Sequence, residues 1–415
     1  MKFSPLFYSR LKDRLVRKYQ KEVRSLSKDA RDFPKLKASR WFQKNIDHFA
    51  DFTPVNWFLL SQLDSLFYFS EATEHVDDGP EFSQLHEEIF DGWNKSEFSG
   101  RFLRSLNTGL SLKKASGQTL KAFDNHLVTL GERHVLRHKK QSWDYVPQTS
   151  LGEVKDRRTG TARLMDTTIT VVGKHLVVKS ASLKEMKDFA NRIEAALKII
   201  KTCSPTSWER FRAFTEAIVP IKQSEFVSYS HQDLPAYSMI NLYDRDFVDL
   251  MDDLLHENGH HHLNYYLNLT KLIDEPEDAI YYSPWRRTPR PLRGIYHAYF
   301  TFFWAFKLFA DLIASGRLEE LDRPLSGVER EKVYWRAVEE FHMLNFSFGD
   351  LRWARKKGLI TKVGWELVEE QQRELRKFQR KIPLWEKKLV AHRKDLRDLR
   401  AVLKSAAKHY SKKNL

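Results

Sequence analysis

The sequence predicts a mainly α-helical protein with a minor β part (an α+β chain), in which a metal-binding helix packs against a central buried helix. Most of the 415 residues lie in stretches whose apolar side chains recur at helical spacing. Alternation typical of strands is confined to two regions, 167–182 and 225–243. An H-E-x-x-H motif flanked by leucines precedes a long apolar segment at 295–313, which predicts the two packed helices.

The expected elements follow one another in this order along the chain. Residues 167–182 predict a hairpin, 182–202 and 207–221 predict helices, and 225–243 predict a second pair of strands. Residues 244–273 form a long expected helix, which is followed by a Pro/Arg-rich loop. Helical pattern resumes at about Ser326, with a break flanked by Gly358 and Gly364. We therefore expect three regions: a mostly helical N-terminal region (1–165), an HExxH catalytic domain (166–375) and a basic C-terminal helix (376–415).

Composition limits the class of protein. Hydrophobic residues make up 41% of the chain, which is enough to build a core and excludes a disordered protein. A single cysteine, Cys203, excludes an intramolecular disulfide and a zinc finger built on cysteines. Because disulfides are absent and the first twenty residues place charges inside every apolar run, we expect a cytoplasmic protein without a secretory signal.

The charge is strongly basic and uneven. Lys and Arg total 70 and Asp and Glu total 55, so the formal charge is +15. Residues 366–415 contain 15 Lys and Arg against 7 Asp and Glu, a surplus of +8. With Trp365, Phe378 and Trp385 this tail could contact nucleic acid. Its mixed charges at helical spacing are more typical of a packing helix, so we do not expect a nucleic-acid partner.

The apolar segment 295–313 is about long enough to span a bilayer. It contains His297, Lys307 and Asp311, which are costly at membrane depth. A helix that is apolar on every side is otherwise found in the centre of a large protein. We expect a buried helix and no membrane span.

The residues that carry chemistry begin with His256, Glu257 and His260, which form the H-E-x-x-H motif. Side chains four apart on a helix share a face, so the two imidazoles can reach one divalent metal ion. The alternative is a solvated helix with stray histidines, but three adjacent histidines at 260–262 would be unusual there. His261 and His262 point away from that face, so we expect them behind the ligands or at the surface. Gly259 costs a helix about 1 kcal/mol relative to alanine, which indicates close approach to the backbone by another element or by a substrate.

A third ligand is needed. The metzincin pattern fails because it requires Gly and His at two later positions, which are Leu263 and Tyr266 here. A gluzincin would use a glutamate on a following helix, but Glu275 and Glu277 lie in a loop interrupted by proline. The better candidate is His297, in the first turn of the apolar helix, because a histidine on so apolar an element needs a partner. The alternative is a core histidine bonded to the backbone.

Four arginines, Arg286, Arg287, Arg290 and Arg293, precede that helix. Arginine grips carboxylates and helix N-termini attract anions. An oxygenase that chelates a 2-oxo acid needs a metal with open positions and a cation for the distal carboxylate, whereas a peptidase needs no such cluster. Arg290 is the first choice because Pro289 and Pro291 stiffen its backbone, with Arg286 or Arg293 in support. The alternative is a solvated basic loop.

The order of these residues resembles a known family. After the H-E-x-x-H motif come Ser283-Pro284-Trp285-Arg286, Arg290-Pro291, Gly294 and His297, and later Leu359-Ile360-Thr361 with Gly364. This pattern, over roughly residues 165–375, is similar to that of the HExxH-type 2-oxoglutarate-dependent peptide β-hydroxylases. The chain departs from the family in having Ala298 where glycine is frequent, and in its extra histidines at 261 and 262.

The resemblance implies a non-haem Fe(II)/2-oxoglutarate-dependent hydroxylase that acts on Cβ of a residue in a ribosomally made peptide. By match, His256, His260 and His297 would bind iron, a loop arginine would hold 2-oxoglutarate, and Glu257 would orient a ligand or water. Three histidines depart from the usual triad of two histidines and one carboxylate. The positive charge would favour an acidic substrate or leader peptide. The rival interpretation is a zinc metallopeptidase with Glu257 as general base.

Overall fold

The computed structural model describes most of the chain outside one long stretch. Described are residues 4–32, 37–44 and 46–50, a few positions between 52 and 64, five strands between 133 and 178, and, with short gaps, residues 183–410. Much of the helical region predicted before residue 165 therefore lies outside the described residues. In the described part the chain is mainly helical with a minor β part, so the predicted fold class is confirmed. No helix of this part is long and apolar enough to cross a membrane.

The described chain forms two compact units. One contains residues 1–11, 192–214 and 244–415, and the other contains residues 12–191 and 215–243. Helices α1 (Pro5–Asp32) and α7 (Leu183–Cys203) contribute to both. The domain boundaries expected near residues 165 and 375 stay predictions.

The second unit contains two β-sheets among its described residues. In the first, β4 (Thr167–Val172) and β5 (His175–Val178) form the predicted hairpin. Its other strands are β1 (Arg133–Lys139), β2 (Ser142–Gln148) and β3 (Ala162–Leu164), in the order β2-β1-β5-β4-β3. The expectation of a mostly helical region before residue 165 missed β1, β2 and β3, because charged residues interrupt their alternation. Helix α2 (Lys37–Lys44) and the 3-10 helix η1 (Ile46–Ala50) also belong to this unit.

The second sheet corrects one helix boundary. The helix expected to run to Pro220 ends earlier, as α8 (Pro205–Phe214), and β6 (Ala217–Ile221) follows. Strand β6 pairs in parallel with β8 (Leu234–Asn241), which also pairs with β7 (Tyr229–His231), so the predicted strands at 225–243 are confirmed. Pro220 cannot donate a backbone hydrogen bond, and it is tolerated because β6 is an edge strand.

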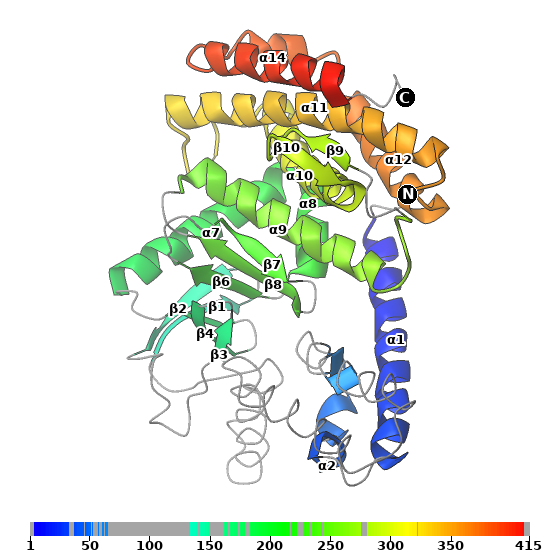
Figure 1. Cartoon of the computed structure of the whole chain (residues 1–415). Helices are drawn as coiled ribbons and strands as arrows, with labels where there is room; N and C mark the ends of the chain where they lie inside the picture. Colours follow the sequence, from blue (N-terminus) through cyan, green and yellow to red (C-terminus); the bar gives the residue numbers. More distant parts are fainter. Residues whose placement is uncertain are drawn as a thin grey trace. The chain divides into compact units, whose positions relative to one another are not determined.

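The first unit is built around one buried helix, α10 (Leu292–Ala314), as Figure 1 shows. It packs against α9 (Phe247–Leu267) on one side and α11 (Gly327–Lys356) on another. Tyr296, Phe303 and Leu308 are 0% exposed, so the predicted buried helix is confirmed. Its charges pair with each other: Lys307 Nζ lies 2.5 Å from a carboxylate oxygen of Asp311.

The remaining elements of this unit surround the buried helix. The arginine loop folds into a short hairpin of β9 (Ile280–Ser283) and β10 (Thr288–Pro291), and Arg287 in its turn has a φ of 51°. Toward the C-terminus come α12 (Lys362–Arg376), α13 (Ile382–Glu386) and α14 (Arg393–Tyr410), and α14 lies along α11 (Figure 1). The basic tail is thus partly packed, as its mixed charges predicted.

The segment after α9 is fastened to the turn before α12. The backbone N–H of Thr361 donates to the carbonyl of Leu272 at 3.0 Å, and the Thr361 hydroxyl donates to the carbonyl of Lys271 at 3.1 Å. Ile273 and Ile360 form an antiparallel bridge. A Cβ added at Gly364 would collide with the Leu272 carbonyl oxygen, which explains why glycine stands there. The turn singled out in the sequence is therefore a structural joint.

Removing the cap of α11 gives a first testable prediction. Ser326 and Glu329 form a capping box: Glu329 N–H donates to Ser326 Oγ at 3.1 Å, and Ser326 N–H donates to Glu329 Oε2 at 2.9 Å. We expect Ser326→Ala to lower the free energy of unfolding by about 1 kcal/mol, measured by urea denaturation. Ser405→Ala, in α14, serves as the control and should change it little.

The same cap should depend on pH. Burial alone would raise the pKa of Glu329, but hydrogen bonds from Ser326 and the nearby Arg323 lower it below its ordinary value. A depressed carboxyl pKa stabilises the fold above the pKa of the unfolded state, and this contribution is lost as pH falls through the folded-state pKa. The stability difference between wild type and Glu329→Gln should accordingly shrink in acid. A difference that grows in acid would contradict the capping role.

Candidate metal centre

Helix α9 carries the H-E-x-x-H motif along the buried helix. The helix begins at Phe247 because the Asp246 carboxylate accepts the backbone N–H of Asp249 at 2.9 Å. Leu254, Leu255 and Leu263 are 0% exposed, so the leucines that flank the motif lie in the core as predicted. The histidines are therefore presented from a rigid element.

Gly259 sets the distance between α9 and α10. A Cβ built at Gly259 would lie 3.1 Å from the Cα of Thr301 on α10, which is tighter than ordinary packing. On the α8 side, the side-chain amide of Asn258 donates to the carbonyl of Phe211 at 3.3 Å. The close approach that the glycine predicted is thus present, and it brings the motif against the helix that carries His297.

The structure brings His256 and His260 together. Their Nε2 atoms are 3.2 Å apart, and their ring centroids are 4.9 Å apart. Two imidazole nitrogens bound to one ion at about 2.1 Å would be about 3.0–3.4 Å from each other in octahedral or tetrahedral geometry. The pair therefore has the spacing of two ligands of one metal ion; without an ion, one neutral ring would donate a hydrogen bond to the other.

His297 lies beside this pair but is not joined to it. Its ring centroid is 6.3 Å from that of His260, whereas two imidazoles bound to one ion through Nε2 would have centroids about 4.5–5.5 Å apart. Among the described residues, no group of three His, Cys, Asp or Glu side chains is close enough to hold a metal ion. His297 Nε2 is nevertheless buried, and in the described part of the chain it has no hydrogen-bond partner. The structure thus pairs His256 with His260 and leaves His297 outside the pair.

All three rings are held in the neutral form. Burial lowers the pKa of His256 to about 4, with smaller contributions from Arg336 and Arg286, and Asp252 opposes the shift. Burial also lowers the pKa of His297 to about 4, helped by Arg293, and it lowers the pKa of His260 well below its ordinary value. Neutral imidazole is the form that offers a lone pair to a metal ion.

The arginines differ in how they approach the histidines. Arg286, Arg290 and Arg293 are all exposed. The positive charge of Arg286 acts on His256, and that of Arg293 acts on His297. Arg290 instead lies along the start of α10, where its Cβ and Cδ are 3.5 and 3.8 Å from a Cβ built at Gly294. The charges of two of the three candidate arginines therefore act on the histidines.

The tryptophan of the S-P-W-R segment, Trp285, packs against His256 through the ring of Phe302. The indole of Trp285 stacks on Phe302 at a centroid distance of 4.9 Å, and Phe302 lies 4.3 Å from the His256 ring. Trp285 Nε1 donates to Glu340 Oε2 at 2.7 Å. The hairpin is thus anchored to α11 while its aromatic ring limits the space next to the first histidine.

A buried ionic cluster beneath the motif was missed by the sequence analysis. Arg336 on α11 pairs with Asp252, Glu339 and Glu340. Asp252 lies one helical turn before His256 and is 7% exposed. The sequence shows that Asp252 lies one helical turn before His256, but this spacing does not predict that Asp252 pairs with Arg336, 84 residues later.

Glu257, His261 and His262 complete the motif. Glu257 is 2% exposed, and its role beside a bound ligand stays a prediction. His261 and His262 are 0% exposed, so a surface position for them was wrong. The His262 ring stacks on Phe214 of α8 at a centroid distance of 4.4 Å, within an aromatic core. This packing explains why extra histidines follow the motif without joining the pair.

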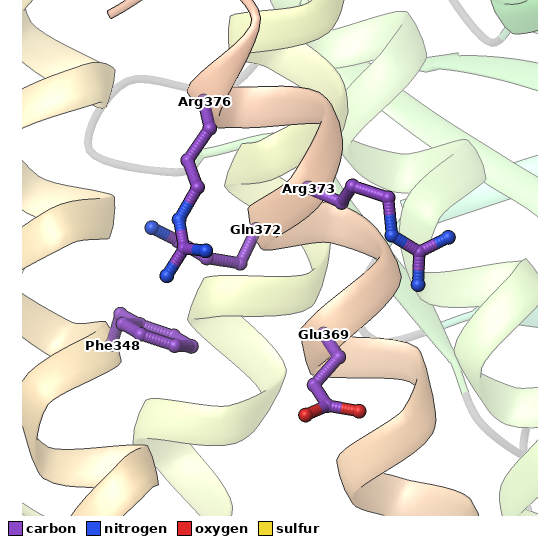
Figure 2. A pocket seen from close by; sticks show the side chains of 5 residues that line it. All are labelled: Phe348, Glu369, Gln372, Arg373 and Arg376. Carbon is purple, nitrogen blue, oxygen red and sulfur yellow. The ribbon is translucent and has the colours of Figure 1, made fainter.

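A hollow of about 240 Å³ lies elsewhere in this unit (Figure 2). Phe348 of α11 forms one side, and α12 supplies Glu369, Gln372, Arg373 and Arg376. The Gln372 amide is already used, since Tyr299 donates to its Oε1 at 2.8 Å and its Nε2 donates to Asn345 at 3.2 Å. Glu369, Arg373 and Arg376 are exposed, and none of the predicted site residues lines the hollow.

Comparison with known proteins adds no family to this geometry. No protein-family model matches the chain, and no curated protein is significantly similar to it.

Proposed function

We propose that the chain is a non-haem Fe(II)/2-oxoglutarate-dependent hydroxylase that acts on Cβ of a residue in a ribosomally made peptide. The observation that carries the proposal is the pair of neutral, inward-facing imidazoles, 3.2 Å apart, with a third neutral imidazole and two arginine charges beside them. The family resemblance of the S-P-W-R…H segment supports it.

The available donors fit such a cofactor. His256 and His260 would hold the ion, and His297 would supply the third nitrogen, which would give its buried Nε2 a partner. Nitrogen ligands suit Fe(II) as well as zinc. When bound, iron would activate dioxygen, which is the oxidant, while oxidative decarboxylation of the 2-oxo acid would supply two of the electrons, and this chemistry can hydroxylate an unactivated carbon.

The protein's own residues would then position and shield. Arg286 and Arg293, whose charges reach the histidines, are better placed than Arg290 to hold the far carboxylate of the 2-oxo acid. Phe302 and Trp285 would keep water from the side of the ion next to His256. Glu257 would orient a ligand. The net charge of +15 favours an acidic peptide or leader.

Anaerobic reconstitution tests the proposal. Adding Fe(II) together with 2-oxoglutarate is expected to produce a weak visible charge-transfer band, which either component alone does not give. Arg286→Ala and Arg293→Ala should raise the 2-oxoglutarate concentration needed for half of the band. Arg317→Ala, far along the chain from the hairpin, serves as the control. Absence of the band at saturating concentrations of both components would contradict the proposal.

A zinc metallopeptidase is the alternative, because the same histidine pair precedes and follows a buried Glu257. A peptidase uses this carboxylate as general base, so Glu257→Gln should abolish peptide cleavage. In the hydroxylase, Glu257→Gln should leave Fe(II) binding and the charge-transfer band in place. Cleavage of peptides with zinc alone, unaffected by 2-oxoglutarate, would establish the alternative.

A further inference from the structure

Arg210 of α8 is a fully buried cation, and none of the described residues forms an ion pair with it. Its side chain is 0% exposed. One guanidinium nitrogen, Nη2, donates to the carbonyl of Leu255 at 3.2 Å. Among the described residues, its Nε and Nη1 have no hydrogen-bond partner, and no carboxylate forms an ion pair with it. A guanidinium does not lose its proton in proteins, so this charge is present inside the core.

The surroundings of Arg210 are aromatic. The guanidinium carbon lies 3.7 Å from the centroid of the Trp304 ring, which stabilises a cation but does not neutralise it. Tyr8 of α1 is close enough for its charge state to interact with that of Arg210, and burial raises its pKa, so its hydroxyl keeps its proton. In the described part of the chain, the Tyr8 hydroxyl is also buried without a hydrogen-bond partner. Two kinds of unused donor therefore lie in one aromatic cluster.

This cluster is separate from the metal centre. Arg210 bonds to the carbonyl of Leu255, and Asn258 bonds to Phe211, so these positions face α8. Asn258 and His262, two and six positions after His256, lie on the opposite side of a helix with 3.6 residues per turn. Among the described residues, Arg210 contacts the Leu255 carbonyl and the Trp304 ring and neither histidine of the pair, although its charge lowers the pKa of His256.

We propose that Arg210, together with the Tyr8 hydroxyl, binds a small monovalent anion such as chloride in the core between α1, α8, α9 and α10. A single negative charge would neutralise the guanidinium and accept hydrogen bonds from the Tyr8 hydroxyl and from either Nε or Nη1. Water would satisfy the donors but leave the charge uncompensated. The neighbouring side chains Phe214 and His262 are 0% exposed and Trp304 is 1% exposed, so the place is closed to solvent, and we choose the smallest common anion as the occupant.

Thermal unfolding of the full chain, without added metal or 2-oxo acid, tests this site independently of the proposed function. At constant ionic strength, replacing gluconate with chloride is expected to raise Tm saturably by about 2–4 °C, because the anion binds only the folded state. Arg210→Met should abolish the increase. Arg212→Met is the matched control, since Arg212 is on the same helix and lies over an aromatic ring, Trp208, but is half exposed. This variant should keep the full response.

Crystals of the wild-type protein grown in sodium bromide provide a second measurement, which does not depend on whether Arg210→Met folds. An anomalous peak within hydrogen-bond distance of Arg210 Nε or Nη1 supports the proposal. Equal Tm values in chloride and gluconate for the wild type, a chloride response that persists in Arg210→Met, or no bromide peak beside Arg210 would each overturn it. Arg210 would then be held by Trp304 and the Leu255 carbonyl alone.

Discussion

Alanine at His260 is expected to weaken Fe(II) binding by at least about 100-fold, because even the residues that only support metal ligands typically contribute 10–100-fold. His260 is the central ring of the three: its Nε2 is 3.2 Å from that of His256, and its ring is 6.3 Å from that of His297. His256→Ala should cause a similar loss. Isothermal titration of the metal-free protein under anaerobic conditions measures both.

The third histidine is tested in the same series. His297→Ala should also reduce Fe(II) affinity and remove the charge-transfer band that requires 2-oxoglutarate. His409→Ala is the control, because His409 on α14 is exposed and its ring bonds only to the carbonyl of Ser405. If His297→Ala keeps wild-type affinity, the assignment of the third ligand is wrong, although the His256–His260 pair would stand.

Methionine at Arg336 is expected to lower the free energy of unfolding by about 3–5 kcal/mol, the usual cost of leaving a buried charge without its partner. Arg336 pairs with Asp252, Glu339 and Glu340, and Glu340 is 0% exposed. Burial raises the pKa of Glu340 well above its ordinary value even beside this arginine, so the carboxylate that loses its counter-charge is that of Asp252, which accepts a hydrogen bond from Arg336 Nε at 2.9 Å. Urea denaturation at neutral pH measures the loss.

Two further variants make this result specific. Arg330→Met, on the same helix, removes a more exposed guanidinium that pairs with Glu319, and should cost at most about 1 kcal/mol. Adding Asp252→Asn to Arg336→Met should recover part of the lost stability, since the amide removes the carboxylate that Arg336 no longer pairs with. If Arg336→Met and Arg330→Met have equal effects, the cluster does not support the core as described.

The sequence was informative where a pattern is local. Leucines on one side of the motif predicted the position of α9, and the unbroken apolar run predicted that α10 would be buried. The boundary of α8 was missed because residues 207–221 keep helical spacing past Phe214, although Ile218 and Val219 are β-branched and precede a proline. There the pairing of β6 with β8 outweighed local preference.

Long-range partners could not be predicted. Nothing near Trp285 in the sequence indicates that its indole bonds to Glu340, 55 residues later. An arginine in an amphipathic helix such as α8 is ordinarily exposed, so Arg210 gave no sign of its burial. The motif predicted which histidines could act together, while the distance that still separates His297 from His260 depends on side-chain packing that no spacing rule contains.

The joint between Leu272 and Thr361 has a consequence for biosynthesis. The ribosome synthesises α9 long before Ile360, which pairs with Ile273 just after the C-terminal end of α9 and follows it by 87 positions. Closing so long a loop carries an entropic cost that only the completed packing offsets. A nascent chain that has reached residue 350 would therefore expose the apolar sides of both central helices. Such an intermediate is the form on which chaperones would act, and slow translation between residues 315 and 360 should increase its aggregation.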